Sequence, residues 1–139
     1  MNTRMQGSQS TGGRLAERAF RQGDVPVVRQ FTEVFGRRAC LAPARLADFV
    51  LAVSEAAACA TAAGPCTARV RLWVSGRRAF CEVRGDGLLL RRTASAGWPG
   101  GRRGEEEAIR RCLLQQIADH VSVASGPDGV RVLLSMTVT

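Results

Sequence analysis

The stretch Leu51-Ala52-Val53-Ser54-Glu55-Ala56-Ala57-Ala58-Cys59-Ala60 decides the fold, because it is the C-terminal half of the best-formed helical signal in the chain. Pro43 opens this helix, and Gly64-Pro65 ends it. Apolar side chains at i, i+3 and i+4 spacing form one stripe along it: Leu46, Phe49, Val50, Val53 and Ala57. Glu55 and Cys59 lie off that stripe. Since they are four residues apart, their side chains are predicted to share one face of the helix.

Two shorter elements are expected before this helix. Asp24 followed by Pro26 is a helix-start signal. Apolar residues at helical spacing then run to about Gly36, namely Val27, Val28, Phe31, Val34 and Phe35. The segment 14–21 fits both a helical and a strand period, and we expect a strand. Residues 1–13 are polar and aperiodic, which predicts a disordered tail.

Beyond Gly64 the hydrophobic period changes from 3.6 to 2, which predicts two antiparallel hairpins. The first turns at Gly76-Arg77-Arg78 and buries one face, made of Val70, Leu72, Val74, Ala79, Cys81 and Val83. The second turns at Gly126-Pro127-Asp128-Gly129, after a strand over 121–125. Its last strand places on one face Val130, Val132, Leu134, Met136 and Val138.

A glycine- and arginine-rich segment, 85–104, separates the two hairpins and predicts a long flexible loop. Glu105-Glu106-Glu107 then opens a third helix, whose apolar face is Ile109, Cys112, Leu113 and Ile117. Helices that interrupt mainly antiparallel strands predict an α+β fold. We therefore expect one domain over 14–139, a two-layer sandwich in which a mixed, mostly antiparallel sheet carries its helices on one face.

The composition restricts the possible partners and compartment. The net charge of +8 comes from 20 arginines and no lysine, which favours acidic partners, although solubilising surface charge is an equal alternative. The sequence shows no run long and apolar enough for a membrane span and no apolar leader, so we expect a cytoplasmic protein with no membrane partner. Five cysteines without a C-x-x-C pair are expected to be small core residues, and a single histidine gives little material for His-based catalysis.

At this point the chain resembles a known family. The string LAVSEAAACA, a hairpin ending in VRGDG, a long loop, and a helix running into IADHVSVASGPDGVRVLLSM are together similar to the GHKL-type (Bergerat, histidine-kinase-like) ATPase domain of bacterial anti-sigma factors with serine kinase activity. The resemblance covers roughly residues 15–138. It implies the Bergerat form of the two-layer α+β fold.

The first family motif, S-E-x-x-x-N-A, lies on the helix quoted above. Its Glu acts as general base and its Asn binds the magnesium on the ATP phosphates, so the resemblance implies a vestigial base at Glu55 and puts Cys59 at the Asn position. A thiol is a poor ligand for Mg²⁺. Without the resemblance, Glu55 is a solvated carboxylate paired with an arginine and Cys59 is a small core residue.

The other two motifs are also altered. V-x-D-x-G-x-G uses its Asp to bind the adenine amino group, but here Gly85 stands at the Asp position, and Asp86 with Gly87 serves only if the register slips by one residue. The phosphate-binding G-x-G-L aligns with residues 108–111, which contain no glycine. Gly101 and Gly104 are the substitutes that a shifted loop would supply. The degenerate nucleotide pocket would therefore consist of Cys59, Asp86 and Gly87.

The resemblance implies an anti-sigma-factor-like regulator that binds a sigma factor or an anti-anti-sigma factor, with ATP binding lost or weakened and no cofactor. The alternative is an active ATP- and Mg²⁺-dependent serine/threonine kinase with Glu55 as base and Asp86 as adenine acceptor. A homodimer is expected by analogy. A third possibility, nucleic-acid binding by the basic loop, is disfavoured because no aromatic residues are interleaved with its arginines.

Overall fold

The computed structural model describes residues 15–62, 67–85, 114–126 and 129–138. Their elements follow the order β1 (Leu15–Arg21), α2 (Val25–Arg38), α3 (Pro43–Ala60), β2 (Thr67–Ser75), β3 (Arg78–Gly85), β4 (His120–Gly126) and β5 (Gly129–Thr137). Residues 114–117 add a helical turn before β4. The predicted order of strands and helices is confirmed for these residues. The predicted tail 1–13, and most of the predicted loop 85–104 and third helix, lie outside them.

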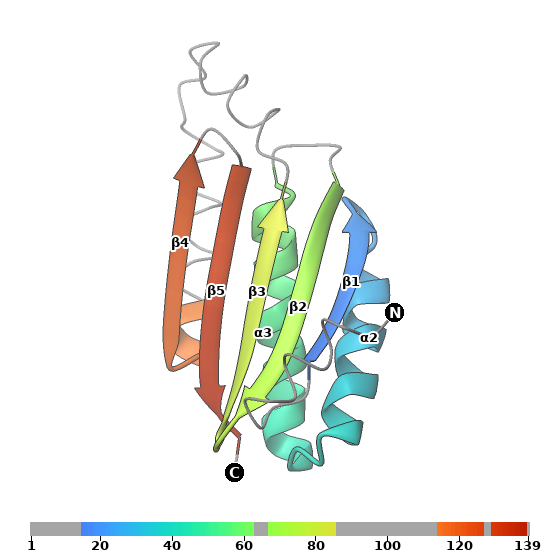
Figure 1. The fold of residues 1–139 in the computed structure, drawn as a ribbon, viewed down its shortest axis with the longest axis vertical. Coiled ribbons are helices and arrows are strands. Elements are labelled where there is room, and N and C mark those ends of the chain that lie inside the picture. The colour runs from blue at the N-terminus through green and yellow to red at the C-terminus, as the bar shows by residue number, and fades with distance from the viewer. Residues whose placement is uncertain (1–14, 63–66, 86–113, 127–128, 139) are drawn as a thin grey trace.

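The five strands form one sheet in the order β1-β2-β3-β5-β4 (Figure 1). All four pairings between them are antiparallel. The prediction of a mixed sheet is therefore wrong for the described strands. The physical reason is that β2–β3 and β4–β5 are hairpins closed by short turns, whereas parallel neighbours need a long crossover.

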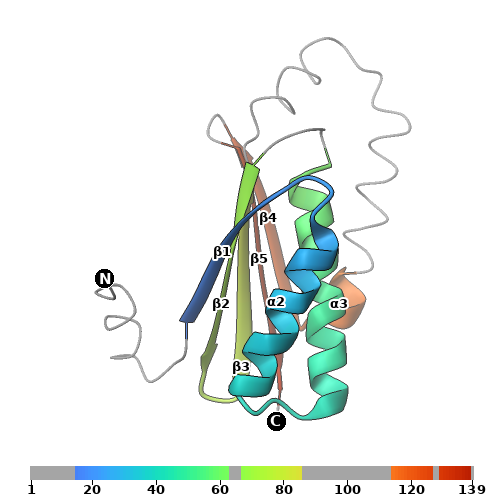
Figure 2. The same cartoon turned by 90° about the vertical axis from the view of Figure 1, so that its right-hand side faces the viewer.

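The helices cover one face of the sheet, as Figure 2 shows, so the predicted two-layer α+β sandwich is confirmed. α3 packs against the central strands β3 and β5, and α2 packs against β1 and β2. The core between the layers contains the inner residues of both hairpins, with Val70, Leu72, Cys81, Val83, Val132 and Met136 fully buried. The opposite face of the sheet carries no helix of the described residues.

The two helices approach each other closely at Gly36. A Cβ atom at this position would overlap the Leu46 side chain, so the small residue lets α3 lie against α2. The Phe35 and Phe49 rings meet across the same contact at 6.5 Å between centroids. No helix in the described residues is long and apolar enough to cross a membrane.

The inner face of α2 differs from the predicted one at two positions. Val34 is 43% exposed, whereas Thr32 is fully buried. The Thr32 hydroxyl donates a 2.7 Å hydrogen bond to the Val28 carbonyl, which satisfies the polar group within its own helix. Asp24 stands at the helix start as predicted, but its carboxylate accepts from the Arg21 backbone N–H instead of capping α2.

Three cysteines fall within the described residues, and two of them are core residues as predicted. Cys59 and Cys81 are buried. Cys40 is exposed, so the prediction is wrong there. It lies in the connection between α2 and α3 with φ at +60°, and such connections run over the surface because their backbone groups need water. Cys66 and Cys112 lie outside the described residues.

Polar contacts tie three elements together at the end of the sheet where β5 finishes. Arg45, in the first turn of α3, donates a 2.8 Å hydrogen bond from Nε to the Thr137 carbonyl. The Asp119 carboxylate, just before β4, accepts from the Thr137 backbone N–H at 2.8 Å and from its hydroxyl at 3.1 Å. The last residue of β5 is thereby held from both layers.

Candidate functional site

The two helix residues of the predicted nucleotide site lie one turn apart on α3, as predicted, but they differ in burial. Glu55 is half-buried and lies on the outer stripe of α3, with the exposed Leu51 one turn before it. Cys59 is one turn further on but is only 8% exposed and belongs to the core. The two side chains therefore do not present a common surface. Cys59 fits the small core residue better than a ligand for a metal ion on bound phosphates.

At Gly85, where the resemblance implies an adenine-binding carboxylate, the packing leaves no room for a side chain. This residue ends β3 next to the C-terminal end of α3, and a Cβ atom on it would overlap the backbone carbonyl oxygen of Ala60. Ala60 is itself buried, so no flexible side chain can move aside. A carboxylate on residue 85 has no room in this packing. The residues present therefore do not fit nucleotide recognition of the family type at this position.

The remaining predicted site residues are not placed. Asp86, Gly87, Gly101, Gly104 and the stretch 108–111 lie outside the described residues. Within the residues that are described, no three His, Cys, Asp or Glu side chains gather in a way that could hold a metal ion.

A second candidate site lies on the face of the sheet that α2 and α3 leave uncovered, here called the open face. The strand registers place three arginines directly opposite one another across β2, β3 and β5: Arg69 pairs with Arg84, and Arg84 pairs with Arg131. We call these three residues the arginine row. At its two ends the row meets only small side chains, Ala19 on β1 and Ala124 on β4.

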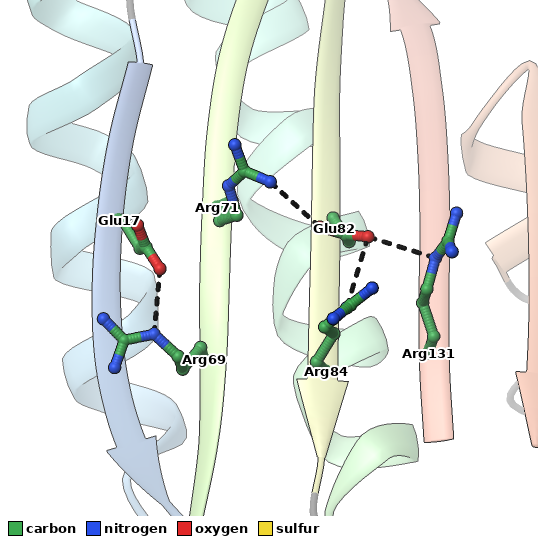
Figure 3. Close-up of polar contacts among 6 residues, drawn as sticks. All are labelled: Glu17, Arg69, Arg71, Glu82, Arg84 and Arg131. Atoms are coloured by element: carbon green, nitrogen blue, oxygen red, sulfur yellow. Dashed lines mark hydrogen bonds and ion pairs between the residues drawn. The ribbon is translucent and has the colours of Figure 1, made fainter. Parts of the chain in front are cut away.

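Glu82 organises the arginines on this face (Figure 3). Its side chain is 10% exposed, and its Oε2 lies 3.0 Å from Arg131 Nε and 3.5 Å from Arg84 Nε. Its other oxygen, Oε1, accepts a 3.4 Å hydrogen bond from Arg71. One carboxylate thus holds three guanidinium groups, whose side chains are 44% to 63% exposed. Arg69, at the end of the row, pairs separately with Glu17 on β1 at 2.8 Å.

An aromatic pair borders the arginines. Trp73 and Phe80 are opposite each other on β2 and β3, and their rings stack at 5.3 Å between centroids with 3° between their planes. The Arg71 guanidinium lies over the Trp73 ring at 5.8 Å. Leu133, opposite Glu82 on β5, continues this half-buried apolar strip. The open face therefore carries an apolar patch beside the arginine row.

Cys81 points from β3 to the other face of the sheet, into the core. Burial raises the pKa of its thiol, and the neighbouring Glu82 charge raises it further. The thiol is therefore protonated at neutral pH and is no nucleophile in the folded protein. It serves as a core residue beneath the Glu82 cluster.

This cluster was not identified from the sequence. The first hairpin places Arg71 opposite Glu82 once its turn is known, so that pair could have been found from the sequence. Arg131 comes from the other hairpin, and it joins them only because β5 lies beside β3. That adjacency crosses the segment between the two hairpins and leaves no signal in local periodicity.

Comparisons with known proteins do not assign the chain to a family. No protein-family model matches the sequence, and none of the curated proteins gives a match. A function for this chain is therefore inferred from its residues and their geometry.

Proposed function

We propose that the protein is an anti-sigma-factor-like regulator that acts by binding a protein partner, a sigma factor or an anti-anti-sigma factor, without ATP-dependent phosphorylation. The proposal combines the motif resemblance of the helix around Glu55 and of the two hairpins with the state of the nucleotide site. We also propose that the two-layer fold is of the Bergerat type.

The observation that carries the proposal is the packing of Gly85 against Ala60. In the resembled family the carboxylate at this position selects adenine, and here the backbone of α3 occupies the space that its side chain needs. Loss of a buried polar contact of this kind costs a ligand about 1–3 kcal/mol, which weakens binding by about fivefold to about 150-fold. Cys59, which stands where the resembled family has its magnesium-binding Asn, is a buried thiol and a poor ligand for Mg²⁺. Losing these nucleotide contacts does not alter the outer surface of the protein. Binding of a protein partner is therefore the activity that we propose it keeps.

Two measurements on the purified chain test the proposal. Calorimetric titration with ATP and Mg²⁺ is expected to give no binding heat at about millimolar nucleotide. Binding assays with the purified sigma subunits and anti-sigma antagonists of the host are expected to detect one stable complex without ATP. A homodimer, proposed by analogy, is checked by the sedimentation of the same sample.

The opposite results would favour the kinase alternative. ATP-dependent transfer of phosphate to a serine of an anti-anti-sigma partner, abolished by Glu55→Gln, would overturn the proposal. A chain that binds none of the sigma subunits or antagonists would also overturn it.

A further inference from the structure

We infer that the open face of the sheet docks an acidic, amphipathic segment of a protein partner. Its carboxylates would bind the arginine row and Arg71, and its apolar side chains would rest on Trp73, Phe80 and Leu133. This inference rests on the proposed function, since it names the surface and the chemistry with which such a regulator holds its partner. The surface is distinct from the predicted nucleotide site, because α3 lies on the other side of the sheet.

The arginine row and its neighbour Arg71 carry more positive charge than the two carboxylates paired with them, Glu17 and Glu82, balance. Like charges directly opposite one another on neighbouring strands destabilise a sheet, yet Arg69, Arg84 and Arg131 stand in line on three strands. Glu82 supplies one negative charge to three arginines, so two positive charges of its cluster remain unbalanced. An anionic partner would supply the missing charge. The row is exposed and is flanked by alanines, so its guanidinium groups are accessible.

The arginine side chains are also preorganised for binding an anion. Guanidinium groups on long side chains lose rotamer freedom when they bind an anion. Here the nearly buried Glu82 already holds Arg84 and Arg131 by their Nε atoms. Part of the ordering cost is therefore met before a partner arrives.

The spacing of the arginines matches that of acidic side chains on a helix. Neighbouring strands lie about 4.8 Å apart, so opposite arginines are presented at roughly that interval. Acidic side chains three or four residues apart in a helix are about 5–6 Å apart, as at positions i, i+4 and i+7. A helix lying across β2, β3 and β5 would thus match the arginine row along one edge.

An apolar border adjoins the arginines on the same face. Trp73, Phe80 and Leu133 lie beside the arginines and are only half-buried within the chain. Trp and Arg are the residue types enriched among interface residues that contribute most to binding. An acidic segment with an apolar edge would pair its carboxylates with the arginines and bury its apolar side chains against this border.

Other occupants match the face less well. A second copy placed face to face would bring two positively charged rows together. A nucleic acid would gain the phosphate contacts, but its bases would need free aromatic faces, and here Trp73 and Phe80 stack on each other while Arg71 covers Trp73. Both are nevertheless outcomes of the test below.

The test uses the full chain and a fluorescently labelled peptide with Glu and Leu at helical spacing, followed by anisotropy. The variant is Arg84→Gln/Arg131→Gln, which removes two exposed charges of the row. Its matched control is Arg29→Gln/Arg38→Gln, which removes two exposed charges from α2 in the other layer. Circular dichroism and melting of each variant check folding. In the row variant the Glu82 carboxylate loses two of its three partners but keeps the 3.4 Å hydrogen bond from Arg71.

We expect the row variant to bind the peptide about tenfold more weakly, the product of about threefold for each exposed charge pair. The control variant should bind within about twofold of the wild type, because its two charges are removed from the other layer. Since the two variants have the same net charge, a difference between them comes from the position of the charges. Trp73→Ala should weaken binding of this peptide but not of one in which Ser replaces Leu. Binding should also weaken when NaCl rises from about 50 to about 300 mM.

Several results would overturn the inference. Equal loss in the row and control variants would mean that only net charge matters. Oligothymidine that displaces the peptide and binds more tightly would assign the face to nucleic acid, and a dimer that dissociates in the row variant would assign it to a second copy.

The partner itself separates this inference from the proposed function. A sigma factor or antagonist bound equally well by the wild type and the row variant overturns the surface and leaves the proposed function standing. Row-dependent peptide binding without any such partner supports the surface and overturns the proposed function.

Discussion

At the scale of single residues, Gly85 shows that a position which differs from a family motif can have a packing role of its own. The resembled nucleotide motif is changed at two positions of this sequence, at its last Gly, where Leu89 stands, and at its Asp, where Gly85 stands. In the structure, its missing side chain is what allows β3 to end against the Ala60 carbonyl. The residue is therefore needed for packing between the two layers, independently of any nucleotide.

Gly85→Asp is accordingly expected to destabilise the protein rather than restore ATP binding. The added Cβ forces β3 and the end of α3 apart, and overpacking of this kind costs about 1–3 kcal/mol, with a further cost for a buried carboxylate. Chemical denaturation measures the loss, and calorimetry with ATP and Mg²⁺ tests binding. Gly76→Asp is the control for added charge, since a Cβ there has open space, although its φ of +62° adds some strain. A stable Gly85→Asp variant that binds ATP would refute this packing argument.

At the scale of elements, strands were predictable and helix faces less so. The alternation of apolar residues in β2, β3 and β5 was sufficient to predict their buried faces, because side chains on a strand have only two directions. The inner face of α2 depends on what it packs against and on a hydroxyl that bonds within the helix, as Thr32 does. The hydrophobic spacing of the sequence reveals neither the packing partner nor this hydrogen bond. The prediction that Val34 lies on the inner face is therefore wrong.

The polar tie at the end of β5 is an element-scale feature with a pH dependence. The hydrogen bond from the Thr137 backbone N–H holds the pKa of Asp119 below its ordinary value, with Arg78 and Arg45 contributing in the same direction. Because the folded-state pKa lies below the unfolded value of about 3.9, this stabilisation is complete well above pH 4 and is lost as the pH falls through the folded value.

Asp119→Ala should therefore lower the free energy of unfolding at pH 7 by about 1 kcal/mol, a value kept small because the carboxylate is exposed. The difference from the wild type should narrow as the pH falls below about 4. Urea denaturation at a series of pH values measures both. Asp48→Ala, which removes the other carboxylate near Arg45, serves as a comparison. A difference that stays constant down to acid pH would show that the carboxylate charge is not responsible.

At the scale of the whole molecule, the two-layer architecture followed from the order of patterns, whereas the candidate surface did not. Helix and strand periods, with turn signals between them, were sufficient to predict an α+β sandwich. The arginine row required the pairing of β3 with β5, which joins residues 84 and 131. No local pattern encodes that pairing, and no aromatic residue adjoins these arginines in sequence, although Trp73 and Phe80 lie on the same face as they do. Long-range register is therefore the information that sequence reasoning lacked.

The charge of the whole molecule leads to a last prediction, on the effect of salt on stability. With a net charge of +8, repulsion among arginines opposes the compact state, and it acts over longer distances than the few close ion pairs. Raising NaCl from about 50 to about 500 mM shortens the screening length from about 14 to about 4 Å, so it suppresses repulsion more than contacts such as the 3.0 Å pair between Arg131 and Glu82. The melting temperature should rise by about 2–4 °C. Arg84→Gln/Arg131→Gln should show a smaller rise, because two of the mutually repelling charges are gone. A melting temperature that falls with salt would mean that the attraction of Glu82 for its arginines outweighs the repulsion, and that the face is already balanced without a partner.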